Sequence, residues 1–191
     1  QLTPILVGMP GSGKSTVGRL LSRRLGLPFF DSDHVIEERL GCTIRDFFAR
    51  EGEDAFRDVE QQVIAELAVG PPCVLATGGG AVLREANREA LRDHGQVIYL
   101  HSSPEEVYRR TRHDRSRPLL QVQDPLGRLR ELYPLRDPLY RETAHFIIET
   151  GRPSVPRRCS ISASESANSQ PRRRASWRPT VDLPLPGRPT R

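Results

Sequence analysis

The sequence predicts an α/β protein in which a five-stranded, mostly parallel sheet is flanked by helices on both faces. Three observations predict this class. Short apolar segments alternate with segments of helical periodicity, glycine and proline residues separate the two kinds, and a glycine-rich loop joins the first strand to the first helix. Proteins of this class bind their ligands at the carboxyl ends of the strands.

In the first half of the chain, aliphatic, β-branched or aromatic runs predict strands at residues 3–7, 29–30 and 73–76. Apolar residues at helical spacing predict helices after Lys14, over residues 35–40 and over residues 56–67. Gly26 and Pro28 end the first of these helices, and Gly70-Pro71-Pro72 ends the third.

In the second half, a polar helix is predicted over residues 84–93 and a strand over residues 96–100. The next helix has a clear start, because Ser103 is a typical N-cap, Pro104 suits the first turn and Glu106 completes a capping box. We expect this helix to run to about Arg112.

The charged, proline-containing segment at residues 112–124 has no regular period and is a candidate mobile loop. Helical spacing returns at Leu126, Leu129 and Leu132. A last strand, predicted at residues 145–148, completes the five.

We expect one domain over residues 1–156, followed by a disordered tail over residues 157–191. The 191-residue chain has a formal net charge of +5, but residues 151–191 contain nine arginines against Glu165 and Asp182. The net charge of residues 1–150 is therefore −2. Arg, Pro and Ser supply 23 of the last 41 residues, and no helix or strand period organises them.

Composition excludes several classes of protein. With 36% hydrophobic and 28% charged residues, the chain has no apolar run near the ~18 residues of a membrane helix. The first seven residues lack the basic and apolar regions of a secretory signal. The three widely spaced cysteines predict neither disulfides nor a paired-cysteine metal site, and the five histidines lack metal-ligand spacing. We expect a cytoplasmic protein.

Residues 8–15, GMPGSGKS, match the phosphate-binding pattern G-x-x-x-x-G-K-[ST] between a predicted strand and a predicted helix. Gly11, Ser12 and Gly13 let successive backbone N–H groups point at phosphate oxygens, and the helix N-terminus adds its positive dipole end. The pattern predicts a P-loop NTPase fold, similar to the nucleoside monophosphate kinases, that binds a nucleoside triphosphate.

Lys14 is the single lysine among 29 basic residues. A slim ammonium fits a loop wrapped around phosphate better than a planar guanidinium does. We expect Lys14 to contact the β- and γ-phosphates, Ser15 to ligate the bridging magnesium ion and Thr16 to add a phosphate contact.

The strand at residues 73–76 ends without the aspartate that usually holds magnesium in P-loop proteins. Asp31 and Asp33, at the end of another strand, are the obvious substitutes. One carboxylate is expected to serve magnesium and the other to orient or deprotonate an attacking hydroxyl. The alternative is a polar turn in which Asp33 caps the following helix; both roles can coexist.

Three further features are weak when taken singly. The triplet Gly78-Gly79-Gly80 at a strand end is either a flexible turn or a place where a ligand approaches backbone N–H groups. Arg57 lies beside the apolar stripe of its predicted helix, where a solvated arginine is the ordinary expectation. Arg136 lies in a stiff segment between two prolines, residues 134–138.

Taken in order, the motifs GMPGSGKST, FFDSD, AFRDVE, TGGGAV, SRPLL and PLRDPLY resemble those of the shikimate kinases, a family of P-loop small-molecule kinases. The resemblance covers about residues 3–153. It implies transfer of the γ-phosphoryl group of ATP to the 3-hydroxyl of shikimate, on the route to chorismate and the aromatic amino acids. It also implies ATP and Mg²⁺ as cofactors and a fold with a lid and a substrate-binding subdomain.

The resemblance also implies roles for individual residues. Asp33 matches the aspartate that binds the substrate hydroxyls and is the candidate base, and Asp31 matches its magnesium-side partner. Arg57 and Arg136 match arginines that bind the substrate carboxylate, a task suited to bidentate guanidinium groups.

The glycine triplet, Gly78, Gly79 and Gly80, matches one that contacts substrate through its backbone. Arg117 matches a lid arginine over the phosphates, and we expect it to share catalysis with Lys14 and Asp33. Arg110 matches an arginine that stacks on adenine, and Arg152 lies in the adenine-side loop of the family.

Shikimate and ATP are thus the expected partners of a monomer that binds neither nucleic acid nor membrane. The chain departs from the family after about residue 156, where the usual last helix is replaced by the Arg-rich tail. Two other interpretations remain. One is a gluconate or nucleoside monophosphate kinase, and the other is a nucleotide-gated protein that binds nucleic acid through the basic tail.

Overall fold

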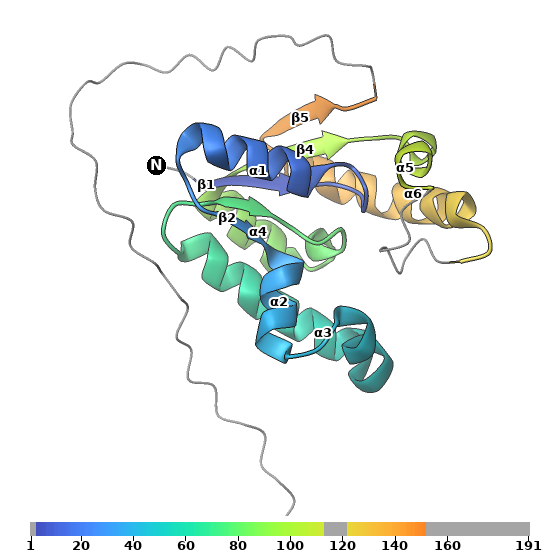
Figure 1. Ribbon diagram of the computed structural model, residues 1–191, viewed down its shortest axis with the longest axis horizontal. Coiled ribbons are helices and arrows are strands. Elements are labelled where there is room, and N and C mark those ends of the chain that lie inside the picture. The colour runs from blue at the N-terminus through green and yellow to red at the C-terminus, as the bar shows by residue number, and fades with distance from the viewer. Residues whose placement is uncertain (1–2, 113–121, 152–191) are drawn as a thin grey trace, which may run out of the picture. The chain divides into compact units, whose positions relative to one another are not determined.

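The structure is a computed structural model that describes residues 3–112 and 122–151 (Figure 1). Contacts within the chain divide it into two units, Gln1–Val155 and Pro156–Arg191. The fold described below belongs to the first unit. The expected tail, residues 157–191, and most of the expected lid lie outside the described residues.

Five parallel strands form one sheet, as the sequence predicted. They are β1 (Thr3–Val7), β2 (Phe29–Asp31), β3 (Val74–Ala76), β4 (Gly95–His101) and β5 (Phe146–Glu149). Their order across the sheet is β2-β3-β1-β4-β5. Asp31 pairs with Ala76, so the carboxyl ends of β2 and β3 lie side by side next to the end of β1.

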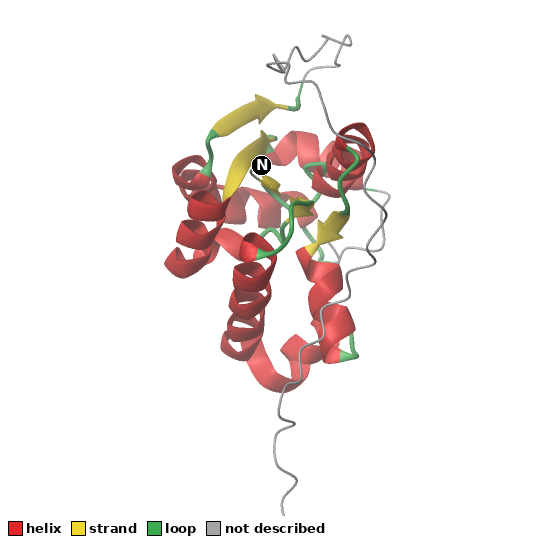
Figure 2. Cartoon of the chain, turned by 90° about the vertical axis from the view of Figure 1, so that its left-hand side faces the viewer, coloured by secondary structure: helices red, strands yellow, loops and turns green. Residues whose placement is uncertain are grey.

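Helices lie on both faces of the sheet (Figure 2). They are α1 (Lys14–Leu25), α2 (Ser32–Leu40), α3 (Ile44–Val69), α4 (Glu85–His94), α5 (Pro104–Thr111) and α6 (Pro125–Thr143), with a short 3-10 helix η1 (Ala81–Leu83). None of the helices in the described part of the chain has the length and apolar character needed to cross a bilayer.

Strand β1 shows how the two faces are filled. Ile5 and Val7 are fully buried in the hydrophobic core with Ile64 of α3. Leu6 points to the opposite face because side chains alternate along a strand. There it packs against α1 at Gly18, where an added Cβ would lie 3.2 Å from Leu6 Cδ1. The sheet is therefore covered on both sides, and its carboxyl end is where proteins of this class bind their ligands.

Two helices differ from their predicted extents. Helix α3 begins at Ile44, twelve residues before the apolar stripe at Phe56, and bends at Gly52, whose φ of 85° and ψ of 176° are not helical. Thr43 caps its start by accepting a hydrogen bond from the Asp46 N–H. The predicted amphipathic pattern, at residues 56–67, covers only the second part of this helix.

The second difference concerns the segment around Arg136. It was predicted as a stiff stretch late in the chain, but it is part of helix α6, with Pro134 and Pro138 inside the helix. These prolines lack an N–H and so cannot donate the usual helical hydrogen bonds. The segment is stiff because it is helical, and this places Arg136 one turn before Tyr140.

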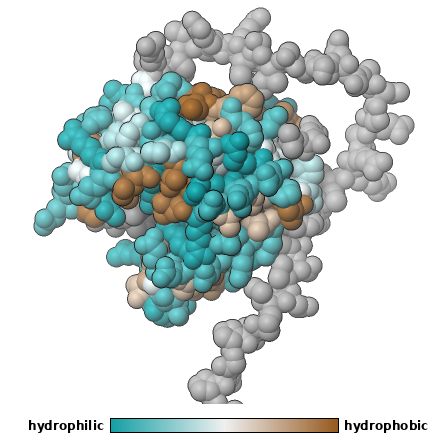
Figure 3. Space-filling model, turned by 180° about the vertical axis from the view of Figure 1, so that it is seen from behind, coloured by the Kyte–Doolittle hydropathy of each residue, from teal (hydrophilic) through white to brown (hydrophobic). Residues whose placement is uncertain are grey.

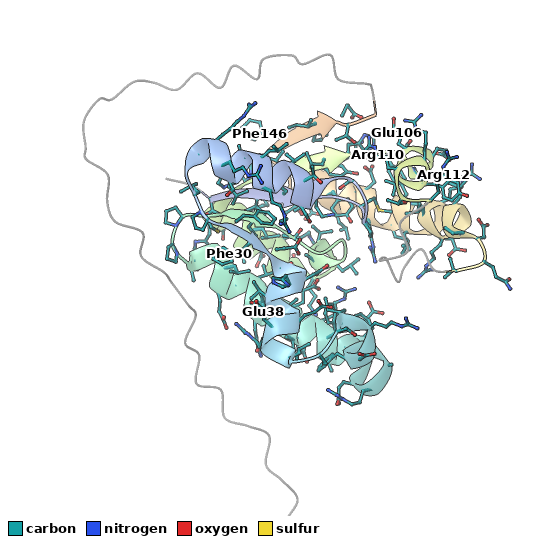
Figure 4. All side chains as sticks on the ribbon, in the orientation of Figure 1. Phe30, Glu38, Glu106, Arg110, Arg112 and Phe146 are labelled. Carbon is teal, nitrogen blue, oxygen red and sulfur yellow. The ribbon has the colours of Figure 1, made fainter. Side chains whose placement is uncertain are left out.

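Strand β5 is an edge strand with unusually exposed apolar side chains. Phe146, Ile147 and Ile148 retain 56%, 44% and 47% of their accessible surface, and Phe146 projects outward in Figure 4. Figure 3 shows that the face seen from behind is otherwise mainly hydrophilic, with a few separate hydrophobic areas.

Candidate active site at the carboxyl end of the sheet

The loop between β1 and α1 adopts a conformation that requires glycine. Gly11 and Gly13 have φ values of 85° and 97°, in the left-handed region that side chains disfavour. A Cβ at Gly11 would also lie 2.6 Å from Thr111 Cγ2. Gly13 is the N-cap of α1 and supplies no side-chain cap, so the first N–H groups of the helix are left for a bound anion.

Lys14 is the first residue of α1 and is buried. Its Nζ donates hydrogen bonds to the carbonyl oxygens of Gly8 (2.8 Å) and Met9 (2.9 Å). The carbonyl groups of the loop thus hold the Lys14 ammonium group in place. Ser12, whose buried Oγ has no hydrogen-bond partner in the structure, lies in the same loop, whereas Thr16 is exposed on α1.

Ser15 and Asp31 meet across the end of the sheet. Ser15 Oγ donates to Asp31 Oδ2 at 2.8 Å, and Asp31 Oδ1 accepts from the Asp33 N–H at 3.2 Å. Asp31, not Asp33, is therefore the N-cap of α2, so the alternative role weighed for Asp33 belongs to its neighbour. A hydroxyl and a carboxylate are oxygen ligands that Mg²⁺ accepts when phosphate and water complete its shell.

The described residues contain no cluster of three or more acidic, histidine or cysteine side chains able to enclose a metal ion by themselves. The donor pair Ser15 and Asp31 fits Mg²⁺ because that ion usually takes one or two protein ligands beside phosphate oxygens. These two residues are the ones placed to hold it.

Asp33 lies in the first turn of α2 against the glycine triplet. Ser32 Oγ accepts a hydrogen bond from the Gly78 N–H at 3.0 Å, and a Cβ at Gly78 would overlap the Asp33 carboxylate. Burial raises the pKa of Asp33 to about 7, and the negative charge of Asp31 adds to this effect. A carboxyl group with a pKa near neutrality is suited to accepting a proton.

Arg57 is held on the other side of the triplet. Its Nη1 donates to Glu60 Oε2 at 2.6 Å and its Nη2 to Glu53 Oε1 at 3.0 Å. An added Cβ at Gly80 would lie 2.5 Å from Arg57 Nη1. Gly80 therefore leaves room for the guanidinium, which is largely buried and not solvated as the sequence alone suggested.

Arg136 is buried, and its Nη1 has no hydrogen-bond partner within the structure. A buried N–H without an acceptor costs free energy, so such a group is typical of a site built for an anion. The guanidinium interacts with Tyr140, one turn later on α6, and Tyr140 donates a hydrogen bond from its hydroxyl to the Gly79 carbonyl at 2.5 Å.

Of the predicted arginines on the nucleotide side, Arg110 is described and stands apart from this group. Arg110 donates hydrogen bonds to Thr150 O at 2.5 Å and to Ser102 Oγ at 3.3 Å, beyond the ends of β4 and β5 (Figure 4). Arg117 and Arg152 lie outside the described residues.

Sequence analysis missed two residues of the site, Glu60 and Tyr140. Glu60 is buried on the apolar stripe of α3, four residues after Phe56 and three before Val63. A charged residue on an apolar stripe, three residues after Arg57, is a pattern that would have found it. Nothing local marks Tyr140, because the carbonyl that it contacts lies 61 residues away.

The fold and the site together define a class of protein. A P-loop, a Ser–Asp pair at its edge, and an acid and two arginines around a glycine turn are arranged to bring a nucleoside triphosphate to a small anionic acceptor. Such an arrangement is that of a P-loop small-molecule kinase.

Comparison with known proteins identifies the family within that class. The family model for shikimate kinase matches residues 10–166, and the chain belongs to the shikimate kinase family. A shikimate kinase of Paracidovorax citrulli is 65% identical over 154 residues, which are 80% of this chain and 84% of that protein. One of Ralstonia nicotianae is 59% identical over 149 residues, 78% of each chain.

Solved structures agree. A shikimate kinase from Acinetobacter baumannii in complex with shikimate superposes with a TM-score of 0.75 and is 49% identical, covering 80% of this chain and 86% of that one. The shikimate kinase of Aquifex aeolicus superposes with a TM-score of 0.69 at 32% identity, covering 80% and 89% of the two chains. The predicted fold and family are confirmed.

Proposed function

We propose that the protein transfers the γ-phosphoryl group of ATP to the 3-hydroxyl of shikimate, forming shikimate 3-phosphate and ADP in chorismate and aromatic amino acid biosynthesis. The observation that carries this proposal is the juxtaposition of Asp33 and Arg57 around the glycine turn that follows β3, with Arg136 near Tyr140, whose hydroxyl bonds to that turn. Shikimate carries a carboxylate and several hydroxyls, so these side chains offer the complementary charges. A relative with 49% identity was solved with shikimate bound.

The P-loop is proposed to hold the triphosphate. Backbone N–H groups of residues 11–16 would cradle its oxygens, and Lys14 would neutralise charge on the β- and γ-phosphates. Because Lys14 already lies against the loop carbonyls, its ammonium needs little reorganisation when ATP binds. Ser15 and Asp31 would hold Mg²⁺, which supplies charge neutralisation on the phosphates.

Asp33 is proposed to orient the 3-hydroxyl and to accept its proton during transfer. Its raised pKa makes the carboxylate a stronger base than an exposed aspartate, while leaving a large ionised fraction above neutral pH. The nearby Lys14 charge lowers the pKa and so keeps this ionised fraction available.

Arg57 and Arg136 are proposed to bind the carboxylate of shikimate, and the backbone of Gly78, Gly79 and Gly80 is proposed to contact the substrate closely. Fixing one end of the acceptor by two guanidinium groups aligns the hydroxyl at the other end with the phosphorus. Alignment and charge neutralisation are the main demands of phosphoryl transfer.

Arg117 is proposed to close over the transferred phosphoryl group on a lid at residues 112–124. Closure would exclude water, which competes as acceptor and wastes ATP. Arg110 and Arg152 are proposed to line the adenine side. For Arg110 this role is supported by its hydrogen bond to the carbonyl oxygen of Thr150, two residues before Arg152 in the sequence.

We further propose that the protein acts in the cytoplasm as a monomer, with small molecules as its partners. Its three widely spaced cysteines suit a reducing compartment. The molar mass from light scattering at micromolar protein concentration tests whether the protein is a monomer.

A coupled assay of ADP release tests the function directly. We expect ATP consumption that depends on shikimate and is at least about 100-fold slower with gluconate or AMP, because a mismatched acceptor leaves buried charges unpaired. Faster turnover of gluconate or AMP would assign the protein to another branch of small-molecule kinases. Steeply salt-dependent DNA binding that is lost with residues 157–191 would instead favour a nucleic-acid role for the tail.

A further inference from the structure

Tyr140 joins two parts of the site that lie far apart in the sequence. It is fully buried on α6, and its hydroxyl donates to the carbonyl oxygen of Gly79 at 2.5 Å. Its ring packs on Tyr99 of β4 with ring centroids 5.0 Å apart, so the phenol has little freedom to turn. The hydroxyl is thus held at one position against the glycine turn.

The same hydroxyl lies near the arginine proposed to bind the substrate carboxylate. Burial raises the pKa of Tyr140, while the nearby positive charge of Arg136 opposes that rise. An arginine only donates hydrogen bonds, and a phenol has one donor and two acceptor positions. The Tyr140 hydroxyl donates to the Gly79 carbonyl, so an N–H of Arg136 can approach only the lone pairs of the Tyr140 oxygen.

The hydrogen bond from Tyr140 to Gly79 has a geometric consequence for the turn. In a trans peptide the carbonyl of Gly79 and the N–H of Gly80 point in opposite directions. Anchoring the carbonyl therefore also sets the direction of the following N–H. Consecutive glycines leave the backbone many conformations, so an anchor outside the turn is needed to select one of them.

We propose that Tyr140 is a positioning residue for shikimate binding: through one hydroxyl it holds the Arg136 guanidinium and the Gly79–Gly80 peptide in the mutual arrangement that receives the acceptor. This inference rests on the proposed function. Tyr140 itself needs no contact with substrate. Its effect reaches the substrate through Arg136 Nη1, the N–H that the structure leaves without a partner, and through the glycine turn.

The test is Tyr140→Phe, which removes the hydroxyl and keeps the ring. We expect the KM for shikimate to rise about 10-fold, the size of one hydrogen bond to a charged group. We expect kcat to change less than about threefold and the KM for ATP to stay as in the wild type, because the P-loop is not touched. Direct titration of shikimate by calorimetry should show the same 10-fold loss.

Tyr99→Phe is the matched control. Tyr99 is buried as deeply as Tyr140 and packs on the Tyr140 ring. Its hydroxyl donates a hydrogen bond to Asp137 at 2.8 Å and not to the glycine turn. Both variants lose one buried hydrogen bond, so both are expected to unfold at a somewhat lower temperature. Only Tyr140→Phe is expected to change the KM for shikimate. An unchanged KM in Tyr140→Phe, or an equal rise in Tyr99→Phe, overturns the proposal.

Arg136→Lys tests separately whether Tyr140 acts through Arg136, because this substitution keeps the positive charge but loses the planar set of donors. If Tyr140 acts partly through Arg136, Tyr140→Phe has a smaller effect on the KM in the Arg136→Lys background than in the wild type. An equal or larger effect in that background contradicts the coupling. Absence of shikimate-dependent ADP release in the wild type would instead reject the proposed function.

Discussion

Arg57 and Glu60 form a buried ion pair beside the proposed acceptor site, with Arg57 Nη1 2.6 Å from Glu60 Oε2 and the Glu60 side chain only 1% exposed. Glu53 contacts the same guanidinium at 3.0 Å, but its side chain is 62% exposed. Burial raises the pKa of Glu60, and Arg57 opposes that rise. Arg57 thus has one buried and one exposed carboxylate partner. Substituting each partner in turn therefore compares what a buried and an exposed ion pair contribute to the free energy of unfolding.

The buried partner is expected to matter for stability and the exposed one is not. Glu60→Gln should lower the free energy of unfolding by about 2 kcal/mol, because it leaves part of a buried guanidinium unpaired. Glu53→Gln should cost less than about 1 kcal/mol, as exposed pairs do. Urea unfolding of the two variants measures both values. Similar losses would show that burial does not set the strength of this pair.

Asp33 is expected to make stability depend on pH in the protein without nucleotide or metal. Its folded-state pKa of about 7 lies above the ordinary aspartate value of 3.8, so the folded state binds the proton more tightly. The stability contribution of this group is therefore complete below pH 3.8 and is lost as the pH rises through 7. Asp33→Asn removes the loss and should stabilise the protein at pH 8, but not at pH 4.

The gain at pH 8 is at most about 4 kcal/mol, since each pKa unit corresponds to about 1.4 kcal/mol, and solvent contact of the half-buried side chain reduces it. Thermal unfolding at the two pH values measures it. The same variant should lower turnover at least about 100-fold while ATP still binds, as expected when a general base is lost. A near-normal rate would remove Asp33 from the mechanism.

Gly80→Ala should affect the acceptor side alone. The backbone at Gly80, with φ −94° and ψ 0°, accepts alanine, so the cost comes from a Cβ placed 2.5 Å from Arg57 Nη1. Displacing this guanidinium should raise the KM for shikimate about 10-fold or more and leave ATP binding as it is. Gly70→Ala, at the end of α3 and away from these groups, is the control; an equal change in KM there would contradict the explanation.

Asp31→Asn tests the proposed metal ligand while sparing the fold. Asparagine caps a helix as well as aspartate does, so α2 keeps its N-cap. A neutral amide is a weaker ligand for Mg²⁺, and the Mg²⁺ concentration for half-maximal activity should rise about 10-fold. Titrating MgCl₂ at fixed ATP measures the change. An unaltered Mg²⁺ requirement would place the metal elsewhere.

Arg117→Ala tests the lid proposal. Because the arginine is expected to act on charge that develops during transfer, turnover should fall by at least about 100-fold, with a much smaller loss of nucleotide affinity. Steady-state kinetics and ATP titration measure the two quantities. Equal losses in both would contradict a role in the transition state.

The local sequence was sufficient for much of the fold. The extents of β1 and the start of α1 follow from an apolar run, a glycine-rich loop and helical spacing within some 25 residues. The start of α5 follows from Ser103, which caps it in the predicted capping box. Helix α3 was predicted too short because the apolar group of its first part, Ile44, Phe47 and Phe48, spans little more than one turn and the bend at Gly52 separates it from the later stripe.

The sequence by itself determined that the chain has a phosphate loop, a single lysine within it and an alternation of strands and helices, because each depends on residue types a few positions apart. The tertiary structure decided which of two aspartates caps α2, that Glu60 lies against Arg57 in the interior, and that Tyr140 reaches Gly79. Those contacts depend on the order of strands in the sheet and on the packing of α3 and α6 against it, which no local pattern specifies.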